Sequence, residues 1–313
     1  MKKKILVVSS ANMDMVLSVK SVPEAGQTVI DNGSYTYVPG GKGANSALAF
    51  SRLGGECTFV TRVGMDQAGD TLVNLYENDG INTKYLKRST DAGTGLATIF
   101  VEESGQNRII VFPGANQKIT SEQIDQAIDE IKPDALFVQF EINRDAILHA
   151  TKKARDAGIP IFVDAGAITE DFPLEELGEV EVFSPNESET LTICGMKPYT
   201  EEGCLVASRL LCQRVNAKYI VVKLGARGAY IYDGSEGVLI PTLPIKPVDT
   251  TAAGDAFTAA LTLEYLSCKD IKRACAYAHI VGTMTVMKKG ASSSIPTIDE
   301  VSKFVKNLTS KKE

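Results

Sequence analysis

The sequence predicts an α/β fold in which a central, mostly parallel sheet is flanked by helices and carries a small β-sheet lid. Three observations support this prediction. Short apolar runs alternate with helix-length periodic segments, which is the pattern of βαβ units. Two stretches without helical periodicity, at about residues 15–38 and 93–112, interrupt the alternation. A chain of 313 residues with 44% apolar residues can also bury a sizeable core.

The periodic segments give the expected elements in chain order. The expected strands are Ile5–Val8, Thr58–Thr61, Ala135–Val138, Ile159–Val163, Val180–Phe183 and Tyr219–Lys223. The expected helices are Gly43–Leu53, Ala68–Asn78, Ser121–Glu130, Arg144–Ala157, Glu187–Cys194, Glu201–Arg214, Asp255–Leu266 and Ile271–Met287. Gly54, Gly80 and Gly158 stand where helix C-termini favour a left-handed residue.

The two helix-free stretches are predicted to pair into a small sheet. Such a flap could cover a cleft, and an edge extension of the main sheet is the alternative. Because no repeat or linker interrupts the pattern, residues 1–313 are expected to form a single α/β domain, with the lid at about 15–38 and 93–112.

Charge and composition exclude several classes of protein. The chain has 33 Lys and Arg against 39 Asp and Glu, and this net charge of −6 disfavours nucleic acids and anionic membranes as partners. No stretch of about 18 apolar residues predicts a transmembrane helix. The six cysteines contain no Cys-x-x-Cys pair, which is typical of a reduced, cytoplasmic protein. We therefore expect a cytoplasmic protein that acts on small molecules.

The segment Val248–Phe257, Val-Asp-Thr-Thr-Ala-Ala-Gly-Asp-Ala-Phe, opens an apolar helix. The small residues 252–254 allow a phosphate to approach backbone N–H groups at the positive end of that helix. Asp255 would stand beside this anion site, where it could take a proton from a substrate hydroxyl. The alternative is that Asp255 is an N-cap or first-turn acid.

The segment Pro39–Asn45, Pro-Gly-Gly-Lys-Gly-Ala-Asn, also runs into a helix. Its glycines expose backbone N–H groups, while Lys42 and Asn45 supply donors suited to hydroxyl oxygens. It is not a Walker A loop, because Gly43 follows Lys42 where that motif has Ser or Thr. A tight strand-to-helix turn is the alternative interpretation.

Polar side chains follow two of the expected buried strands. Asn12 and Asp14 come after the first strand, and Glu141 comes after Ala135–Val138. Open α/β sheets bind ligands at the carboxyl ends of their strands, so Asp14 could accept hydrogen bonds from two neighbouring sugar hydroxyls. Each acid could instead be a solvated loop residue.

Taken together, residues 40–45 (Gly-Gly-Lys-Gly-Ala-Asn) and 249–255 (Asp-Thr-Thr-Ala-Ala-Gly-Asp) resemble the signatures of the ribokinase-like, or PfkB, carbohydrate kinases, and of their ribokinase branch. The resemblance extends over essentially the whole chain. It implies a ribokinase-like fold and ATP-dependent transfer of the γ-phosphate to a primary hydroxyl, with D-ribose converted to D-ribose 5-phosphate. Fructokinase, deoxyribokinase and nucleoside kinase activities are alternatives. A non-catalytic sugar- or nucleotide-binding regulator is a further alternative, which the intact Gly254–Asp255 pair disfavours.

The resemblance also implies roles for individual residues around a small-molecule sugar. Asp255 would deprotonate the sugar hydroxyl, and the γ-phosphoryl group would bind in an anion hole. The anion hole would be formed by Ala252, Ala253 and Gly254. The sugar would be held by Asn12, Asp14, Gly40, Gly41, Lys42, Asn45 and Glu141.

For ATP and its ions, the resemblance implies three further groups of residues. Asn186 and Glu189 match an Asn-x-x-Glu element that supports the Mg²⁺ and phosphate network, although an acid cluster at a helix N-terminus is the alternative. The nucleotide would also contact Lys223, Gly225, Gly228 and His279. A monovalent-cation site would use Asp249, Thr251, Thr285, Lys288, Gly290 and Ser294. Its oxygen ligands suit K⁺, which predicts activation by potassium.

Three positions depart from the family pattern. Lys223 stands where many ribokinases have Thr, and Pro39 where a bulkier residue is common. Residues 164–167 read Asp-Ala-Gly-Ala, where ribokinases have an Asn-Pro-Ala-Pro run. Finally, the exposed strands of the lid predict a homodimer that forms through the lid.

Overall fold

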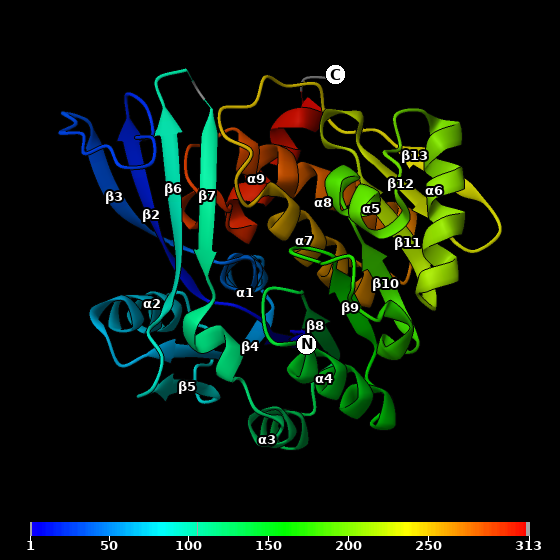
Figure 1. Cartoon of the computed structure of the whole chain (residues 1–313). Coiled ribbons are helices and arrows are strands. Elements are labelled where there is room, and N and C mark those ends of the chain that lie inside the picture. The colour runs from blue at the N-terminus through cyan, green and yellow to red at the C-terminus, as the bar shows by residue number, and fades with distance from the viewer. Residues whose placement is uncertain (1, 105, 311–313) are drawn as a thin grey trace.

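The computed structural model describes residues 2–104 and 106–310, and two sheets organise this part of the chain (Figure 1). Residue 105, in the second expected lid segment, lies outside the described residues. The larger sheet has the strand order β13-β12-β11-β10-β9-β8-β1-β4-β5. Its strands are β1 (Lys4–Val8), β4 (Glu56–Gly64), β5 (Leu86–Ser89), β8 (Ala135–Val138), β9 (Ile161–Asp164), β10 (Val180–Ser184), β11 (Ala217–Lys223), β12 (Ala229–Tyr232) and β13 (Gly237–Ile240). Neighbours from β5 to β11 run parallel, whereas β12 and β13 are antiparallel additions.

Helices cover both faces of this sheet, which confirms the predicted fold class. The helices are α1 (Lys42–Arg52), α2 (Gln67–Asn78), α3 (Ser121–Ile131), α4 (Arg144–Asp156), α5 (Glu187–Cys194), α6 (Glu201–Arg214), α7 (Ala253–Cys268), α8 (Ile271–Val286) and α9 (Ile298–Ser310). Alternate residues of β1 enter opposite cores, with Ile5 and Val7 packed among residues of α1, α7 and α8. Leu6 and Val8 pack among residues of α3, α4 and α6. This double burial explains why the strand is continuously apolar.

The smaller sheet has the order β3-β2-β6-β7 and stands apart from the larger one (Figure 1). Its strands are β2 (Asn12–Val19), β3 (Ser34–Gly40), β6 (Gly95–Glu102) and β7 (Asn107–Phe112). Both helix-free stretches therefore contribute strands to it. The edge-extension alternative is wrong, because the two sheets share no strand pairing in the described residues.

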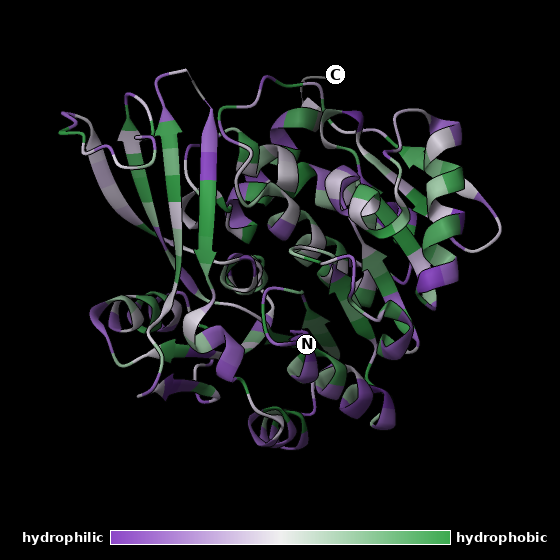
Figure 2. Cartoon of the chain, viewed as in Figure 1, coloured by the Kyte–Doolittle hydropathy of each residue, from purple (hydrophilic) through white to green (hydrophobic). Residues whose placement is uncertain are grey.

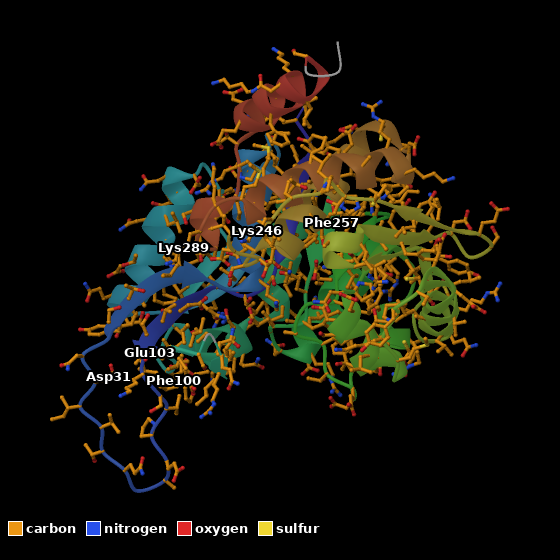
Figure 3. The ribbon with its side chains drawn as sticks, turned by 90° about the horizontal axis from the view of Figure 1, so that it is seen from above. Asp31, Phe100, Glu103, Lys246, Phe257 and Lys289 are labelled. Atoms are coloured by element: carbon orange, nitrogen blue, oxygen red, sulfur yellow. The ribbon has the colours of Figure 1, made fainter. Side chains whose placement is uncertain are left out.

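Several expected strands are longer in the structure, as for β4 and β11, and two expected regions contain residues that form no strand. Within 15–38, residues 20–33 form no strand, because Pro23 and the Gly26 turn interrupt the pattern and the segment lies in solvent. The strand expected at Ile159–Val163 begins at Ile161, because the Ile159 N–H donates back to Ala154 of α4. Figure 3 shows the segment that carries Asp31 projecting away from the body that contains Phe257.

None of the helices in the described ranges combines the length and the apolar character that a bilayer crossing requires. The parallel strands instead bring the carboxyl ends of β1, β8, β9, β10 and β11 to one edge of the larger sheet. The residues that follow these strands come together at that edge.

Candidate active site

Asp255 lies in the first turn of α7, which begins at Ala253, two residues earlier than predicted. Its buried carboxylate accepts hydrogen bonds from Asn45 Nδ2 at 2.9 Å and Gln139 Nε2 at 3.3 Å. Ala252 is the N-cap residue, and Asp255 makes no side-chain cap hydrogen bond. Asp255 is therefore not the N-cap, whereas the other half of the alternative, an acid in the first turn, is correct. Burial raises the pKa of Asp255 to about 6, whereas the charge of Lys42 opposes the shift.

The expected anion hole lies at the first turn of α7. Ala252 has a left-handed conformation, with φ of 62°, which turns the chain sharply into the helix. The Gly254 N–H has no acceptor among the described residues, as the geometry of a first helical turn dictates. Ala253 differs, since its N–H donates to Thr250 O at 3.3 Å. The positive end of the helix lies directly beside the Asp255 carboxylate.

Two buried acceptors among the expected sugar residues lack partners. Asp14 Oδ1 and Asn45 Oδ1 accept no hydrogen bond from any described residue. Buried polar atoms are rarely left unpaired, so these oxygens suit a ligand with several hydroxyl donors. Burial raises the pKa of Asp14 to about 7, to which the charge of Glu141 adds and which Lys42 opposes.

Glycines allow the backbone to approach these acids closely. A Cβ on Gly40 would lie 2.1 Å from Asp14 Oδ2, so no larger residue fits beside the carboxylate. Gly41 is the N-cap residue of α1 and has φ of 91°, a conformation that favours glycine. Glu141 then accepts from the Lys42 backbone N–H at 3.1 Å and from the Ser10 hydroxyl. The turn, Asp14 and Glu141 thus form one wall of the site.

Lys42 lies among the acids of the site. The charge of Asp255 has the largest effect on Lys42 and raises its pKa. Smaller effects in the same direction come from Glu141, Glu189 and Asp164, whereas burial lowers the pKa. The ammonium therefore stays protonated and offsets part of the negative charge in the site.

Asn12 lies at the same edge, but its side-chain oxygen is already paired. Asn116 Nδ2 donates to Asn12 Oδ1 at 2.7 Å, and Asn116 Oδ1 accepts from the Ala11 N–H at 2.9 Å. A Cβ on Gly95 would lie 2.2 Å from Asn12 Oδ1. Asn12 and Asn116 consequently join the β1–β2 junction to the base of the smaller sheet. Sequence reasoning missed Asn116, because the interaction depends on chain segments that only the fold brings together.

Asn186 and Glu189 form a capping box at the start of α5. Asn186 Oδ1 accepts from the Glu189 N–H at 2.8 Å, and Glu189 Oε2 accepts from the Asn186 N–H at 2.7 Å. The acid cluster at a helix N-terminus, considered above as the alternative, is thus present. Carboxylate oxygens have several acceptor sites, so Glu189 keeps capacity for a further ligand. Burial raises the pKa of Glu189, and Lys223 opposes this shift.

The expected nucleotide residues occupy two separate environments. Lys223 ends β11, followed by a turn in which Gly225 and Gly228 have φ of 55° and 103°. His279 lies in α8, with its ring 5.1 Å from that of Phe257. Burial lowers the pKa of His279 to about 4, so the ring is neutral near pH 7. Within the described residues, the His279 ring contacts Cys275, Phe257 and the Ile240 backbone, and it makes no hydrogen bond or ion pair with the charged cluster formed by Lys42, Asp164, Lys223 and Asp255.

The expected cation residues are drawn together mainly by Asp249. Asp249 Oδ1 accepts from the Thr251 N–H at 2.9 Å, and Oδ2 accepts from the Gly290 N–H at 2.9 Å. The Lys288 N–H donates to Thr285 O at 3.3 Å. Ser294 is bonded within its own turn, to Ala291 O at 2.7 Å. The loop before α7 is thereby fastened to the segment after α8.

All three departures from the family pattern lie at this site or beside it. Lys223 forms an ion pair with Asp164. Gly166 packs on the Lys42 stem, where a Cβ would lie 2.6 Å from Lys42 Cδ. Pro39 lies in β3, where it pairs with Met13 of β2. Because β3 is an edge strand, it tolerates the missing N–H of proline.

Gln139 is a second residue that sequence reasoning missed. It is fully buried at the end of β8, where its Nε2 donates to Asp255 and its Oε1 accepts from Ser9 Oγ at 3.1 Å. The available signal was a polar residue in the apolar run 135–140, two positions before Glu141. Gln139 and Asn45 together hold the Asp255 carboxylate from two sides.

Comparison with known proteins shows the family of the chain. A family model described as pfkB family carbohydrate kinase matches residues 2–298. The chain is 33% identical over 304 residues to the ribokinase of Bacillus subtilis, covering 97% of this chain and 99% of that one. It is 35% identical over 301 residues to the bifunctional ribokinase/ribose-5-phosphate isomerase A of Fructilactobacillus sanfranciscensis, covering 96% of this chain but only 55% of that protein. The structure of Arabidopsis thaliana ribokinase complexed with ribose and ATP superposes with a TM-score of 0.87 and 29% identity, covering 97% of this chain and 98% of that one. The protein therefore belongs to the pfkB family of carbohydrate kinases.

Proposed function

We propose that the protein transfers the γ-phosphate of ATP to the primary hydroxyl of D-ribose, giving D-ribose 5-phosphate and ADP. The observation that carries this proposal is the buried Asp255 carboxylate, held by two amides beside the first turn of α7. Asn45, which contacts Asp255, and Asp14, which lies near Lys42 and Glu141, each have an unpaired side-chain oxygen that suits a polyhydroxylated acceptor. The similarity to ribokinases over nearly the whole chain supports the same assignment.

In the proposed reaction, Asp255 takes the proton of the sugar hydroxyl as its oxygen attacks the γ-phosphorus. The bond between that phosphorus and the bridging oxygen breaks, and ADP leaves with the electron pair. Backbone N–H groups of the first α7 turn and the ammonium of Lys42 stabilise the developing negative charge. Mg²⁺, bound with the nucleotide near Asn186 and Glu189, would supply further charge neutralisation.

The charge of the site favours a neutral acceptor. Asp14 and Glu141 line the proposed sugar side, where Lys42 is the cation that faces them. A sugar phosphate would meet two acids there, whereas phosphate groups usually bind to Arg or to several donors. Free sugars with adjacent hydroxyls are the acceptors that fit this wall.

The experiment that tests the function is an ADP-release assay with Mg-ATP and potassium. The acceptors are ribose, deoxyribose, fructose, adenosine, pseudouridine and fructose 6-phosphate. We expect the highest kcat/KM with ribose. Preference for another neutral acceptor would replace ribose but keep the kinase mechanism, whereas no turnover with any acceptor would favour the non-catalytic regulator.

Activity should decline at acidic pH, below about pH 6, because the base must be ionised and the pKa of Asp255 is raised to about 6. Gln139→Leu should move this acidic limb to higher pH, since the lost N–H donor stabilised the ionised carboxylate. The pKa of Asp255 also depends on the charges of Lys42, Lys223 and Asp164, which this substitution leaves in place. The measurement is kcat at saturating sugar against pH, because Asp14, whose pKa is raised to about 7, would add its own acidic limb to kcat/KM. The control is Gln126→Leu, at an exposed position of α3. An unchanged acidic limb in Gln139→Leu would contradict the role of this amide.

We also propose that potassium activates the enzyme through Asp249 and the neighbouring carbonyl groups. An oxygen-only ligand set of mostly neutral carbonyls suits a monovalent cation. Because Asp249 contacts both Thr251 and Gly290, an ion there would order the loop that precedes Gly254. Turnover should be several-fold higher in KCl than in NaCl at equal ionic strength, and Asp249→Asn should reduce the difference. Equal turnover in the two salts would be the contrary result.

The smaller sheet offers a surface for the proposed homodimer. Every residue of β7 is exposed, and Figure 2 shows that most of this strand is apolar. Because β3 and β7 are unpaired edges, a second copy could cover them. Light scattering at micromolar concentration should give twice the monomer mass, and Ile110→Asp should restore the monomer. A monomer mass for the unaltered protein would exclude this assembly.

A further inference from the structure

Lys223 and Asp164, two of the departures from the family pattern, contact each other at the ends of β11 and β9. The Lys223 ammonium donates to Asp164 Oδ2 and lies 3.3 Å from Thr258 Oγ1. Thr258 in turn donates to Asp164 Oδ2 at 2.5 Å. The side chains of Lys223 and Asp164 are 12% and 3% exposed. These three groups form a closed triangle that fixes the position of the ammonium.

The triangle lies beside the first turn of α7. A Cβ built on Gly254 would lie 3.7 Å from Lys223 Nζ. Thr258, one turn further along α7, also has its Oγ1 3.0 Å from Gly254 O. The ammonium is therefore within reach of a phosphoryl group that binds at the Gly254 N–H.

The donors of Lys223 are not exhausted by these contacts. A Lys ammonium carries three N–H donors, and Asp164 and Thr258 accept two of them. We propose that the third is donated to the terminal phosphoryl group of ATP, and that Asp164 and Thr258 are positioning residues that hold Lys223 ready for it. The inference rests on the proposed kinase function and deepens it by assigning a particular phosphate contact.

The charges of the site explain why such a cation is useful. Asp255 and Glu189 lie close to Lys223, since its charge acts on both carboxyl groups. A polyphosphate entering there meets repulsion from these acids, which a second cation beside Lys42 offsets. Asp164 also accepts the Gly166 N–H at 3.0 Å, so it is held independently of Lys223. The ion pair keeps the buried ammonium compensated before the nucleotide arrives.

The test compares ligands that differ only in their phosphates. Calorimetric dissociation constants are measured for adenosine, Mg-ADP and the magnesium complex of the non-hydrolysable analogue β,γ-imido-ATP. Lys223→Met should weaken the analogue about 10- to 100-fold, as expected for a hydrogen bond between charged groups. Adenosine and Mg-ADP should change less than about twofold. The matched control is Lys218→Met, on the same strand but ion-paired with Glu181 at 2.8 Å.

Because Lys223→Met leaves Asp164 buried without its partner, that variant could unfold. The double variant Asp164→Asn/Lys223→Met removes both charges and should show the same selective loss for the analogue. Equal losses for adenosine would indicate a structural role only, and equal losses for Mg-ADP would assign the contact to another phosphate. Either result, or unchanged binding of the analogue, would overturn the proposal.

The positioning role is tested by the coupling between the two substitutions. Asp164→Asn should weaken the analogue a few-fold when Lys223 is present and should have no effect in the Lys223→Met background. Equal effects in both backgrounds would overturn the positioning role. If the unaltered protein bound neither the analogue nor Mg-ADP, the proposed function itself would fail. Normal binding by the unaltered protein and by all variants would instead remove only this inference.

Discussion

Replacing Asp255 with Asn is expected to lower kcat by about 10²–10⁴-fold, while the dissociation constant of the sugar stays within a few-fold of that of the unaltered protein. Asn cannot accept the proton of the sugar hydroxyl, but it has nearly the same shape and can still bond to Asn45 or Gln139. Single-turnover phosphorylation and sugar binding by calorimetry measure the two quantities separately.

A matched control distinguishes a catalytic acid from a helix-capping acid. Asp270 caps α8, where its Oδ1 accepts from the Lys272 and Arg273 N–H groups. Asp270→Ala should cost about 1 kcal/mol of stability and leave kcat unchanged. If Asp255→Asn behaved like Asp270→Ala, Asp255 would have no part in proton transfer.

Asp14→Ala is expected to lower kcat/KM for the sugar by about 10²–10⁴-fold, mainly through KM. The proposed role of the carboxylate is to accept from two sugar hydroxyls, and hydrogen bonds to charged groups contribute about 1.5–3 kcal/mol each. Its Oδ1 has no partner among the described residues, so removal of the side chain breaks no internal hydrogen bond of that atom. Initial rates over a range of ribose concentrations separate KM from kcat.

Two further variants sharpen this test. Gly40→Ala should reproduce the defect, because its Cβ would displace the Asp14 carboxylate. Asp31→Ala is the control, since Asp31 lies on the projecting segment and accepts from the backbone of Lys20 and Gly33 (Figure 3). A fall in kcat at constant KM for Asp14→Ala would contradict a binding role.

Much of the fold could be predicted from the sequence, because the larger sheet is built from strands and helices with strong periodicity. Helices α5 and α6 agree with the prediction at both ends, and strand β8 does as well. The prediction did not include β5, β12, β13 and α9, although the sequence of α9 is amphipathic. Strand β5 reads Leu-Lys-Arg-Ser and has no apolar pattern, whereas β12 and β13 are apolar but only four residues long, which is too short for a strong periodic signal.

The site was predictable where backbone signals mark it, and not where side chains meet across the fold. Runs of small residues at helix starts mark Gly41 and Gly254 as candidates from sequence alone. The contact between Gln139 and Asp255 joins residues 116 positions apart, and that between Lys223 and Asp164 joins residues 59 apart. No local pattern encodes such pairs. Two departures that looked independent in the sequence are one ion pair in the structure.

Strand β2 links the proposed sugar contact mechanically to the smaller sheet. Asp14 lies two residues from Asn12, where Asn116 fixes the strand, whereas Val19 lies seven residues away. At about 3.3 Å per residue, a rotation of about 10° about Asn12 would move Val19 by roughly 4 Å and Asp14 by roughly 1 Å. A shift of 1 Å in a reacting group can change a rate about 100-fold. A displacement of a few ångströms at the far end of β2 therefore becomes a displacement of about 1 Å at Asp14, which is the scale on which catalysis is sensitive.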